Sequence, residues 1–455
     1  MATTTLEQEL RARFGESVVQ GVPSMYLADQ TESRGLHGRA DAVIRPGSAA
    51  EVADVVAWCY ARDVPIVPRG GGTGYAAGAV PRDGGVVLAL ERLDSVRSFD
   101  PLLWRVEVEA GVTTAALRQL ARGSGLLFPP DPGAAEQSQV GGNVATNAGG
   151  PHAFKYGVTG AWVTGLEAVV APGELVRFGG PIRKDVAGYD LKSLLVGSEG
   201  TLGIVTSIWF RLVPAPEASL PAASFHADTA AGCAAIERVL GNGLAVSAIE
   251  YLDNECMRLA APSFPGPVPD GAFMVLVDVD GSREETARLS GEVREVLAQD
   301  ALAVWAPATA AETTALWRWR DGVSLAVQAL RGGKVSEDIV VPLDRLAEAI
   351  EGTIEIGRRH GLDACSWGHA GDGNLHSTFL VARDDAAALA RAAAAAQELF
   401  ALAIDLGGSI SGEHGVGIVK NGQLEKQWSA AAMNMHRSVK LALDPKGLFN
   451  PGKKA

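Results

Sequence analysis

The stretch VPRGGGTGYAAGAVP, residues 67–81, decides how this chain folds. It continues an apolar run typical of a buried strand, and it carries five glycines between positions 70 and 78. Glycine adopts positive φ without steric cost, and successive glycines let several backbone N–H groups converge on one anion. The stretch therefore predicts a loop that binds a phosphate. A purely structural loop is the alternative for any single run of this kind.

A Rossmann dinucleotide loop is a second alternative, because Gly72, Gly74 and Ala77 satisfy the pattern G-x-G-x-x-A. A Rossmann turn opens directly into a helix and is followed by an acidic residue about 20 positions later. Here GAVPRDGG, residues 78–85, places a proline and further glycines where that helix should run. The context therefore argues against a nicotinamide cofactor in a Rossmann fold.

Two more glycine-rich runs lie downstream, GGNVATNAGG at 141–150 and GSEGTLG at 197–203. Either run could close an ordinary turn. Three such runs within one region favour a single extended ligand that carries phosphate and is held by backbone amides at several points.

Composition sets the class of protein. A chain of 455 residues exceeds one ordinary core, so two or three domains are expected. Apolar residues make up 47% and charged residues 20%, as in soluble proteins, and the net charge of −13 disfavours a nucleic-acid partner. We find no run of about 18 uncharged apolar residues and no signal core, so neither a transmembrane segment nor secretion is expected. Four scattered cysteines predict reduced thiols in a cytoplasmic protein.

Helix signals and proline breaks indicate how the chain is organised. Ser48 is a predicted helix N-cap, Glu51 completes its capping box, and Pro-Ala-Pro at 214–216 interrupts a strand pattern. The predicted segments are a helical lead-in at 1–35, a first region with a β-α-β start at 36–216, a second region of long helices and strands at 217–405, and a tail at 406–455.

The segment SWGHAGDGNLHSTF, residues 366–379, carries two histidines on either side of a predicted turn. If Gly371–Asn374 is a four-residue loop between two strands, His369 faces directly across to His376. Opposed side chains share one face of a sheet with Cβ atoms about 5 Å apart, a span that lets two imidazoles bind one divalent ion. Two histidines that merely flank a loop are the plainer interpretation.

A metal site needs a third ligand, and GGSISGEHGVG, residues 407–417, offers Glu413 with His414 beside it. Glycines on both sides indicate a close approach of the backbone to a ligand. His369, His376 and Glu413 would form a His₂Glu set with an open position, the pattern of a catalytic zinc site, although manganese or iron also suits these ligands. His414 is then free to act as a base, since histidine titrates near neutral pH.

Four long motifs in order make the chain resemble a known family. They are the stretch at 67–81, GGNVATNAGGPHAFKYGVT from 141, KDVAGYDLKSLLVGSEGTLGIVT from 184, and GGSISGEHGVG from 407 with LDPKGLFNPGK at 443–453. Over about residues 36–454 the chain is similar to the FAD-linked D-2-hydroxyacid dehydrogenases of the vanillyl-alcohol-oxidase superfamily. These include D-lactate dehydrogenase, D-2-hydroxyglutarate dehydrogenase and the flavin subunit of glycolate oxidase.

The resemblance implies an α+β fold with three parts. A two-part FAD-binding domain of the PCMH type occupies 36–216, an α+β cap domain with an antiparallel sheet holds the substrate at 217–405, and the segment 406–455 returns to the FAD domain. Some relatives link FAD to a histidine in the first glycine run, whereas this chain has Thr73-Gly74-Tyr75 there, so a non-covalent FAD is expected.

The resemblance also implies which residues contact FAD. Backbone amides of the first glycine run would wrap the pyrophosphate, and later residues would contact the rest of the cofactor. The implied set is Arg69, Gly70, Gly71, Gly72, Thr73, Gly74 and Tyr75 at the pyrophosphate; Pro130, Asp131, Gly142, Asn143, Thr146, Asn147 and Gly149 at the ribityl chain and isoalloxazine; Glu199, Gly200, Ile204 and Val205 at the adenine side; and Asn450 from the tail.

A substrate carboxylate is best bound by a bidentate arginine, and WRWRDGVSLAVQALRGGK at 317–334 supplies several cations. By resemblance, Arg320 is the carboxylate anchor, with Ser324, Lys334 and Thr378 in the same substrate pocket. Relatives that accept longer diacids can present an asparagine where this chain has Thr378, and often a threonine where it has Ser324. Both departures argue against 2-hydroxyglutarate as the preferred substrate.

The implied activity is the FAD-dependent oxidation of a small D-2-hydroxy acid, D-lactate or glycolate, to the 2-oxo acid. Hydride passes to flavin N5, a divalent metal (zinc first) polarises the hydroxyl, and His414 takes its proton. The alternatives are a D-2-hydroxyglutarate dehydrogenase and a non-catalytic flavin subunit of a glycolate oxidase complex. Quinone, cytochrome, electron-transfer flavoprotein and an iron–sulfur subunit are all open as electron acceptors. A homodimer and an oxidase-complex subunit are both open, as is a peripheral location at the inner face of the membrane.

Overall fold

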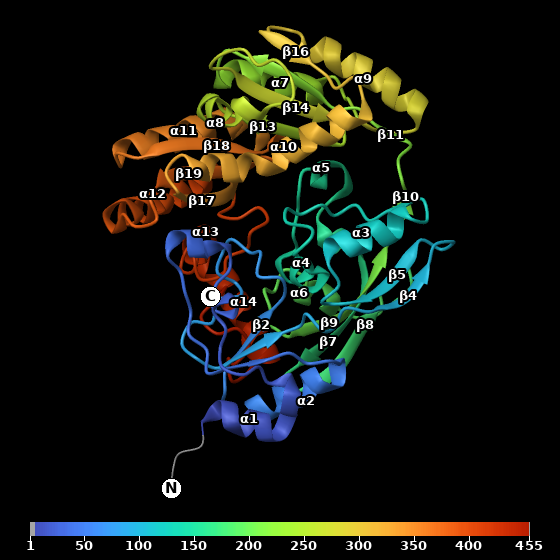
Figure 1. Cartoon of the computed structure of the whole chain (residues 1–455), viewed down its shortest axis with the longest axis vertical. Helices are drawn as coiled ribbons and strands as arrows, with labels where there is room; N and C mark the ends of the chain where they lie inside the picture. Colours follow the sequence, from blue (N-terminus) through green and yellow to red (C-terminus); the bar gives the residue numbers. More distant parts are fainter. Residues whose placement is uncertain (1–4, 455) are drawn as a thin grey trace. The chain divides into compact units, whose positions relative to one another are not determined.

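The computed structural model describes residues 5–454, which form two compact units (Figure 1). The first unit contains the described residues up to Gly149, Val158–Ala215 and those from Glu413 onward. The second unit contains Gly150–Gly157 and Pro216–Gly412. The first unit is therefore discontinuous, because the end of the chain returns to it.

One short segment of the second unit lies, in sequence, within the predicted first region. Residues 150–157 belong to the second unit, whereas the sequence pattern places them inside the first region. They carry the short helix α5 (Ala153–Tyr156), and the Tyr156 hydroxyl donates to Asp280 Oδ2 at 2.7 Å. A contact between residues 124 positions apart cannot be recognised from local punctuation.

The first unit contains a parallel three-stranded sheet in the order β1-β3-β2. Helix α2 (Ala49–Tyr60) connects β1 to β2, and Ser48 Oγ accepts the Glu51 N–H at 3.2 Å, which confirms the predicted N-cap. The Glu51 carboxylate accepts from the Gly47 N–H at 2.7 Å, so the predicted capping box closes one residue before the N-cap. The strands are β1 (Ala42–Ile44), β2 (Ile66–Arg69) and β3 (Val86–Ala89).

A second, antiparallel sheet completes the first unit in the order β4-β5-β9-β7-β8. Its strands are β4 (Val96–Asp100), β5 (Arg105–Glu109), β7 (Val163–Val170), β8 (Glu174–Gly179) and β9 (Ile204–Arg211); β6 (Leu126–Leu127) pairs with β10 (Val213–Pro214) beside it. The other helices of this unit are α1 (Leu6–Phe14), α3 (Thr114–Arg122), α4 (Val140–Thr146), α6 (Leu191–Leu195), α13 (Leu424–Gln427) and α14 (Ala430–Leu443).

The end of the chain is bonded to the start of the first unit. Asp444, which is fully buried, accepts the Tyr60 hydroxyl at 2.6 Å. The Ile66 N–H donates to the Leu448 carbonyl at 2.8 Å, and the Asn450 N–H donates to the Ile66 carbonyl at 2.7 Å. The tail after α14 therefore extends along β2, the strand that leads into the first glycine run.

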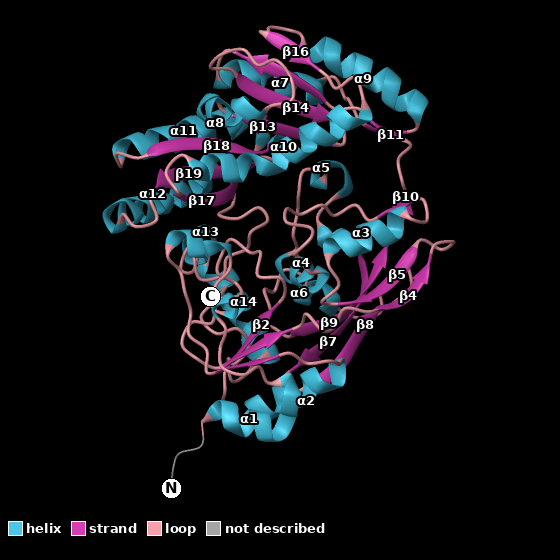
Figure 2. Ribbon diagram, viewed as in Figure 1, coloured by secondary structure: helices cyan, strands magenta, loops and turns pink. Residues whose placement is uncertain are grey.

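The second unit is built on a seven-stranded antiparallel sheet in the order β16-β12-β14-β13-β18-β19-β17 (Figure 2). Its strands are β12 (Ala222–His226), β13 (Ala248–Leu252), β14 (Phe273–Asp278), β16 (Ala303–Trp305), β17 (Gly333–Val340), β18 (Asp363–His369) and β19 (Asn374–Val381), while β11 (Ala218–Ser219) pairs with β15 (Asp280–Gly281).

Helices cover both faces of this sheet. Helices α8 and α10 pack on one face through the cluster that contains Met257, Trp319 and Trp367. Helices α7, α9, α11 and α12 pack on the other face. The bounds are α7 (Thr229–Gly241), α8 (Asn254–Ala260), α9 (Arg283–Leu297), α10 (Ala310–Ala329), α11 (Leu346–Arg359) and α12 (Ala386–Asp405).

Helix α12 is the one helix within residues 5–454 that is long and apolar enough, by length and composition, to cross a membrane. One such helix is weak evidence for a span, because core helices of soluble proteins pass the same test. Its alanine-rich face, with Ala392, Leu399 and Phe400, is buried against α11, β17 and β19. We therefore regard α12 as a packed helix of the second unit.

Candidate functional site

The first glycine run follows β2 and leaves its backbone donors without acceptors. Within residues 5–454, the N–H groups of residues 70–74 donate to no protein atom. A Cβ at Gly72, where φ is 68°, would lie 2.1 Å from Arg69 Nη2, and one at Gly71 would lie 1.9 Å from the Gln137 carbonyl oxygen. Side chains are thus excluded at Gly71 and Gly72, and the half-buried amides of the loop are available to bind an external anion.

Buried charges lie beside this loop. Arg69 Nη2 donates to the Met25 carbonyl at 2.6 Å, while Nη1 has no hydrogen-bond partner among the described residues. Burial lowers the pKa of Arg69, raises the pKa of Asp29, and lowers the pKa of Lys453 to about 7. An anion such as a phosphate would supply the missing acceptor and would favour the charged forms of both cations.

The other two glycine runs are hydrogen-bonded to each other. Residues 141–150 begin as helix α4, and its C-terminal carbonyls at Val144 and Ala145 accept the N–H groups of Gly197 (2.9 Å) and Glu199 (2.7 Å) from the third run. A helix end leaves carbonyls without intrahelical partners, so the third run satisfies the end of α4. The amides of Gly197 and Glu199 are therefore occupied within the protein, and the contact of these two runs with a cofactor stays a prediction.

Glu199, predicted at the adenine side, joins the tail to the third glycine run. Its carboxylate accepts the N–H groups of Val416 (2.9 Å) and Gly417 (2.7 Å) and pairs with Lys454 at 3.1 Å. Asn450 donates its side-chain amide to the Glu199 carbonyl at 2.7 Å. Both predicted cofactor residues thus hold the C-terminal segment in place.

The residues predicted along the ribityl chain lie on and around α4. A Cβ at Gly142 would meet no atom within 4 Å, so this helix surface is open. Asn143 and Asn147 are engaged internally, since Asn143 donates to Thr114 Oγ1 at 2.6 Å and Asn147 accepts the Gly160 N–H at 2.8 Å. Of the other predicted residues, Pro130, Gly149, Gly200, Ile204 and Val205 are buried, and Asp131 and Thr146 are half-buried.

The predicted histidine turn joins β18 to β19, but its register differs by two residues from the prediction. The loop is Ala370–Gly373, and its last residue has a φ of 66°, so the return strand starts at Asn374. His376 therefore opposes Trp367, and His369 opposes Asn374. A shift of two keeps each side chain on its face, and the two imidazole centroids still lie 5.2 Å apart.

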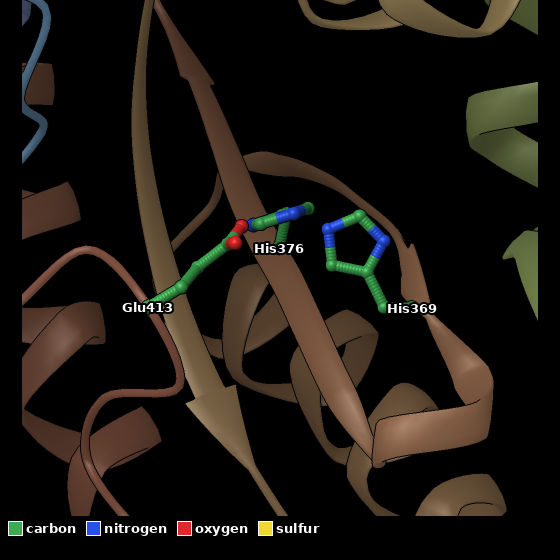
Figure 3. A group of neighbouring side chains, drawn as sticks. All are labelled: His369, His376 and Glu413. Atoms are coloured by element: carbon green, nitrogen blue, oxygen red, sulfur yellow. The ribbon is translucent and has the colours of Figure 1, made fainter. Parts of the chain in front are cut away.

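His369, His376 and Glu413 are brought together in the structure (Figure 3). Their ligand atoms all lie within 4.8 Å of one another, and the two histidines are buried. Glu413 directly follows Gly412, whose N–H donates to Asp338 Oδ2 at 2.8 Å. The set offers two imidazole nitrogens and a carboxylate, which are the donors of a divalent-metal site.

The tail was predicted to begin at residue 406. The second unit extends to Gly412, because Ser409 exchanges two backbone hydrogen bonds of 2.8 and 2.9 Å with Val340 at the end of β17. The segment that precedes Glu413 is thus held along the edge of the sheet that carries both histidines.

His414, the predicted base, contacts the first glycine run. Its ring stacks on Tyr75 with centroids 4.8 Å apart and planes at 23°. Its Nε2 lies 4.0 Å from Glu413 Oε1, and 16% of its side chain is exposed. The stacking restricts the orientation of the imidazole, and the partial exposure leaves it accessible to a ligand.

Two of the predicted substrate residues, Thr378 and Lys334, share the sheet face that carries the histidines, and a third, Ser324, lies on helix α10. Thr378 lies two positions after His376, and its hydroxyl is 2.8 Å from that of Ser336 on β17. Lys334 lies two positions before Ser336 and donates to the carbonyl of Ser324 on α10 at 3.0 Å, with a further contact to its hydroxyl. Burial lowers the pKa of Lys334 to about 8.

Arg320 also lies on α10 and is paired with Glu250, a residue that the sequence reasoning missed. Glu250 is fully buried, and its other oxygen lies 2.7 Å from His369 Nδ1. The strand AIEYL at 248–252 carried a usable signal, because a lone acid within an apolar strand is seldom buried without a partner. Its partner His369 lies 119 positions later, so the pairing could not be predicted.

Two family models match the chain and together cover both units. The model described as FAD binding domain matches residues 40–179, and that described as FAD linked oxidases, C-terminal domain, matches residues 215–454. The chain belongs to the FAD-linked oxidases. The resemblance inferred from its motifs is thereby confirmed, and FAD is the cofactor of this family's binding domain.

Curated relatives of this FAD-linked oxidase match nearly its whole length. The glycolate oxidase subunit GlcD of Bacillus subtilis (strain 168) is 35% identical over 415 residues, covering 91% of this chain and 88% of that protein. D-lactate dehydrogenase of Anaerostipes hadrus is 33% identical over 429 residues, covering 91% and 89%. The mitochondrial D-2-hydroxyglutarate dehydrogenase of Rattus norvegicus is 32% identical over 439 residues, covering 92% and 79%.

Solved structures show the same fold at low sequence identity. A p-cresol methylhydroxylase with substrate bound has a TM-score of 0.82 at 17% identity, covering 98% of this FAD-linked oxidase and 95% of that chain. The 4-ethylphenol oxidase from Gulosibacter chungangensis has a TM-score of 0.75 at 22% identity, covering 91% and 89%. The predicted α+β class, with a PCMH-type FAD-binding domain and an antiparallel cap sheet, is confirmed.

Proposed function

We propose that this FAD-linked oxidase oxidises a small D-2-hydroxy acid, D-lactate or glycolate, to the corresponding 2-oxo acid. One observation carries the proposal. His369, His376 and Glu250 lie on one face of the sheet, and the buried Glu250 pairs with Arg320 of helix α10. A 2-hydroxy acid presents a carboxylate next to a hydroxyl, so it requires a cation for the first group and an electrophile for the second. The named relatives, a glycolate oxidase subunit and a D-lactate dehydrogenase, support the same substrate class.

The first unit would hold FAD through the loop at residues 70–74, whose unpaired amides fit a pyrophosphate, with Arg69 as the adjacent cation. The loop has no histidine or cysteine, so the proposed FAD is non-covalent. When bound, FAD would supply the acceptor for the hydride at C2 of the substrate.

A divalent metal, zinc in the first instance, is assigned to His369, His376 and Glu413. The donor set suits zinc, and manganese and iron use the same ligand types. Because His369 Nδ1 faces Glu250, Nε2 is the nitrogen left for a metal. Such a cation, when bound, would lower the pKa of the substrate hydroxyl.

Arg320 would bind the substrate carboxylate. Its Nε has no acceptor among the described residues, and its side chain is buried on the sheet face. A buried guanidinium donor without an acceptor is costly unless a ligand supplies one. Lys334 would add a second positive charge, and Thr378 would lie in the same substrate pocket.

His414 would remove the proton of the substrate hydroxyl. An imidazole accepts a proton at neutral pH, and the stacking on Tyr75 fixes the plane of the ring. The side chain lies next to Glu413 in sequence, so the base and the proposed metal ligand are carried by the same segment.

Anaerobic bleaching of the flavin tests the proposed function. The protein is mixed with D-lactate, L-lactate, glycolate and D-2-hydroxyglutarate in turn, and the flavin absorbance near 450 nm is followed in the absence of oxygen. Rapid bleaching by D-lactate or glycolate is expected. Faster bleaching by D-2-hydroxyglutarate would make that diacid the substrate, and no bleaching by any acid would refute the proposed oxidation.

Reduced flavin must pass its electrons on, and the proposed acceptor is a quinone, a cytochrome, an electron-transfer flavoprotein or an iron–sulfur subunit. The names of the GlcD relatives support a place in an oxidase complex.

All four cysteines are unpaired and buried, which fits the proposed cytoplasmic location.

The binding of the substrate should weaken in alkaline solution because of Lys334. Its pKa of about 8 means that the amine is protonated below that pH and neutral above it. If the cation helps to bind the carboxylate, KM should rise by up to about tenfold per pH unit above pH 8 while kcat changes little. Initial rates between pH 6.5 and about 9.5 measure this effect. Lys334→Arg keeps its charge in this range, so its KM should stay flat, and a flat profile for the wild type would contradict the prediction.

A further inference from the structure

Glu250 connects two parts of the second unit that have separate proposed roles. It lies on β13, directly opposite His369 of β18 in the antiparallel register, and its side chain is fully buried. One carboxylate oxygen is 2.7 Å from His369 Nδ1. The other oxygen forms an ion pair with Arg320 Nη2, from the helix that covers this face of the sheet.

We propose that Glu250 is the positioning residue of the site: it fixes the tautomer and the ring orientation of His369 for metal binding, and it holds Arg320 for the substrate carboxylate. The inference rests on the proposed function, because it assigns a role to Glu250 within the same site.

The role towards His369 follows from hydrogen bonding. A buried carboxylate accepts a hydrogen bond and cannot donate one when ionised, so Nδ1 of His369 must carry the proton. Nε2 is then the unprotonated nitrogen, and it is the nitrogen that can bind a metal. A carboxylate behind a ligating histidine also raises the basicity of the ligand, and the loss of such a partner typically weakens metal binding about 10- to 100-fold.

The role towards Arg320 follows from charge. A buried guanidinium without a counter-charge is strongly disfavoured, and Glu250 is the carboxylate that pairs with it. The pair leaves Arg320 Nε without an acceptor within residues 5–454. One carboxylate therefore orients both side chains on a single face of the sheet, and it sets the separation between the two groups that a 2-hydroxy acid would contact.

Metal affinity of the intact, flavin-loaded protein tests the inference without measuring turnover. The metal-free protein is titrated with Zn²⁺ in competition with a fluorescent chelator, as the wild type, as Glu250→Gln and as Glu167→Gln. Glu167 is the matched control, because it is also buried and ion-paired with Arg97 at 2.8 Å, but on β7 of the first unit. Loss of stability alone should affect both variants.

Glu250→Gln should weaken Zn²⁺ binding about 10- to 100-fold, whereas Glu167→Gln should bind Zn²⁺ as the wild type does. If Glu250→Gln fails to fold, Glu250→Asp, which keeps the charge on a shorter side chain, should bind Zn²⁺ less tightly than the wild type. Wild-type affinity in the folded Glu250 variant, or an equal loss in the control, would overturn the inference. A wild type that binds no Zn²⁺ would overturn it as well, whereas a wild type that binds Zn²⁺ but shows no flavin bleaching would overturn only the proposed reaction.

Discussion

Replacing His414 by alanine should abolish the reduction of the flavin by D-lactate or glycolate while FAD stays bound. A general base contributes about 10²- to 10⁴-fold to a proton transfer, so the rate of anaerobic bleaching should fall by at least that factor. FAD should be retained, because the amides of residues 70–74 and Arg69 do not depend on the imidazole. Stopped-flow absorbance near 450 nm measures the rate, and the visible spectrum of the desalted protein measures retained FAD.

His37→Ala is the control for this prediction. His37 is in the same unit, its side chain is 53% exposed, and it pairs with the exposed Glu32. It should bleach at the wild-type rate. Rapid bleaching of His414→Ala would exclude this residue as the base, and loss of FAD from the variant would assign the residue to cofactor binding.

Removing the proposed metal should also stop the reaction. Polarisation of a hydroxyl by a divalent cation is worth several kcal/mol of transition-state stabilisation, which corresponds to about 10³-fold or more in rate. The protein is treated with a chelator, its metal content is measured by elemental analysis, and bleaching is recorded before and after Zn²⁺ or Mn²⁺ is restored. Bleaching should be lost on removal and recovered on return of the metal.

His376→Ala should reproduce the loss caused by chelation, and added metal should not rescue it. His360→Ala is the control in the same unit, because His360 is paired with the surface residue Glu398 at 2.7 Å. Full bleaching by a protein shown to contain no metal would remove the cation from the mechanism while leaving the flavin chemistry untouched.

The anion loop at residues 70–74 stays a prediction, whereas the hydrogen bonds that join the other two glycine runs were not predicted. The loop is defined locally, because the glycines at 70–74 act through their own backbone. The run at 141–150 enters a helix although glycine disfavours one by about 1 kcal/mol per residue. Gly141 is required there by packing, since a Cβ would lie 2.6 Å from Ala110 Cβ. A tertiary contact of this kind overrides local propensity and cannot be recognised in one segment.

For the two histidines, the face of the sheet could be predicted from sequence, whereas the register of the strand pairing could not. Side chains alternate between the two faces of a strand, so the prediction placed His369 and His376 on one face. A register error of two residues leaves them on that face. The register itself depends on one glycine, Gly373, which adopts the left-handed conformation and ends the loop one residue earlier than predicted. Glu250 could not be found in this way, because its position opposite His369 depends on which strands are neighbours in the sheet.

The bonds between the tail and the start of the first unit have a consequence for biosynthesis. Tyr60, Ile66 and Gly78 receive partners from residues 444–453, which are synthesised after the whole second unit. The second unit contains every partner it needs for its own sheet before those residues leave the ribosome. The second unit can therefore form its sheet before the first unit is complete, and a complete first unit is available to a cofactor only after residues 444–453 have been synthesised.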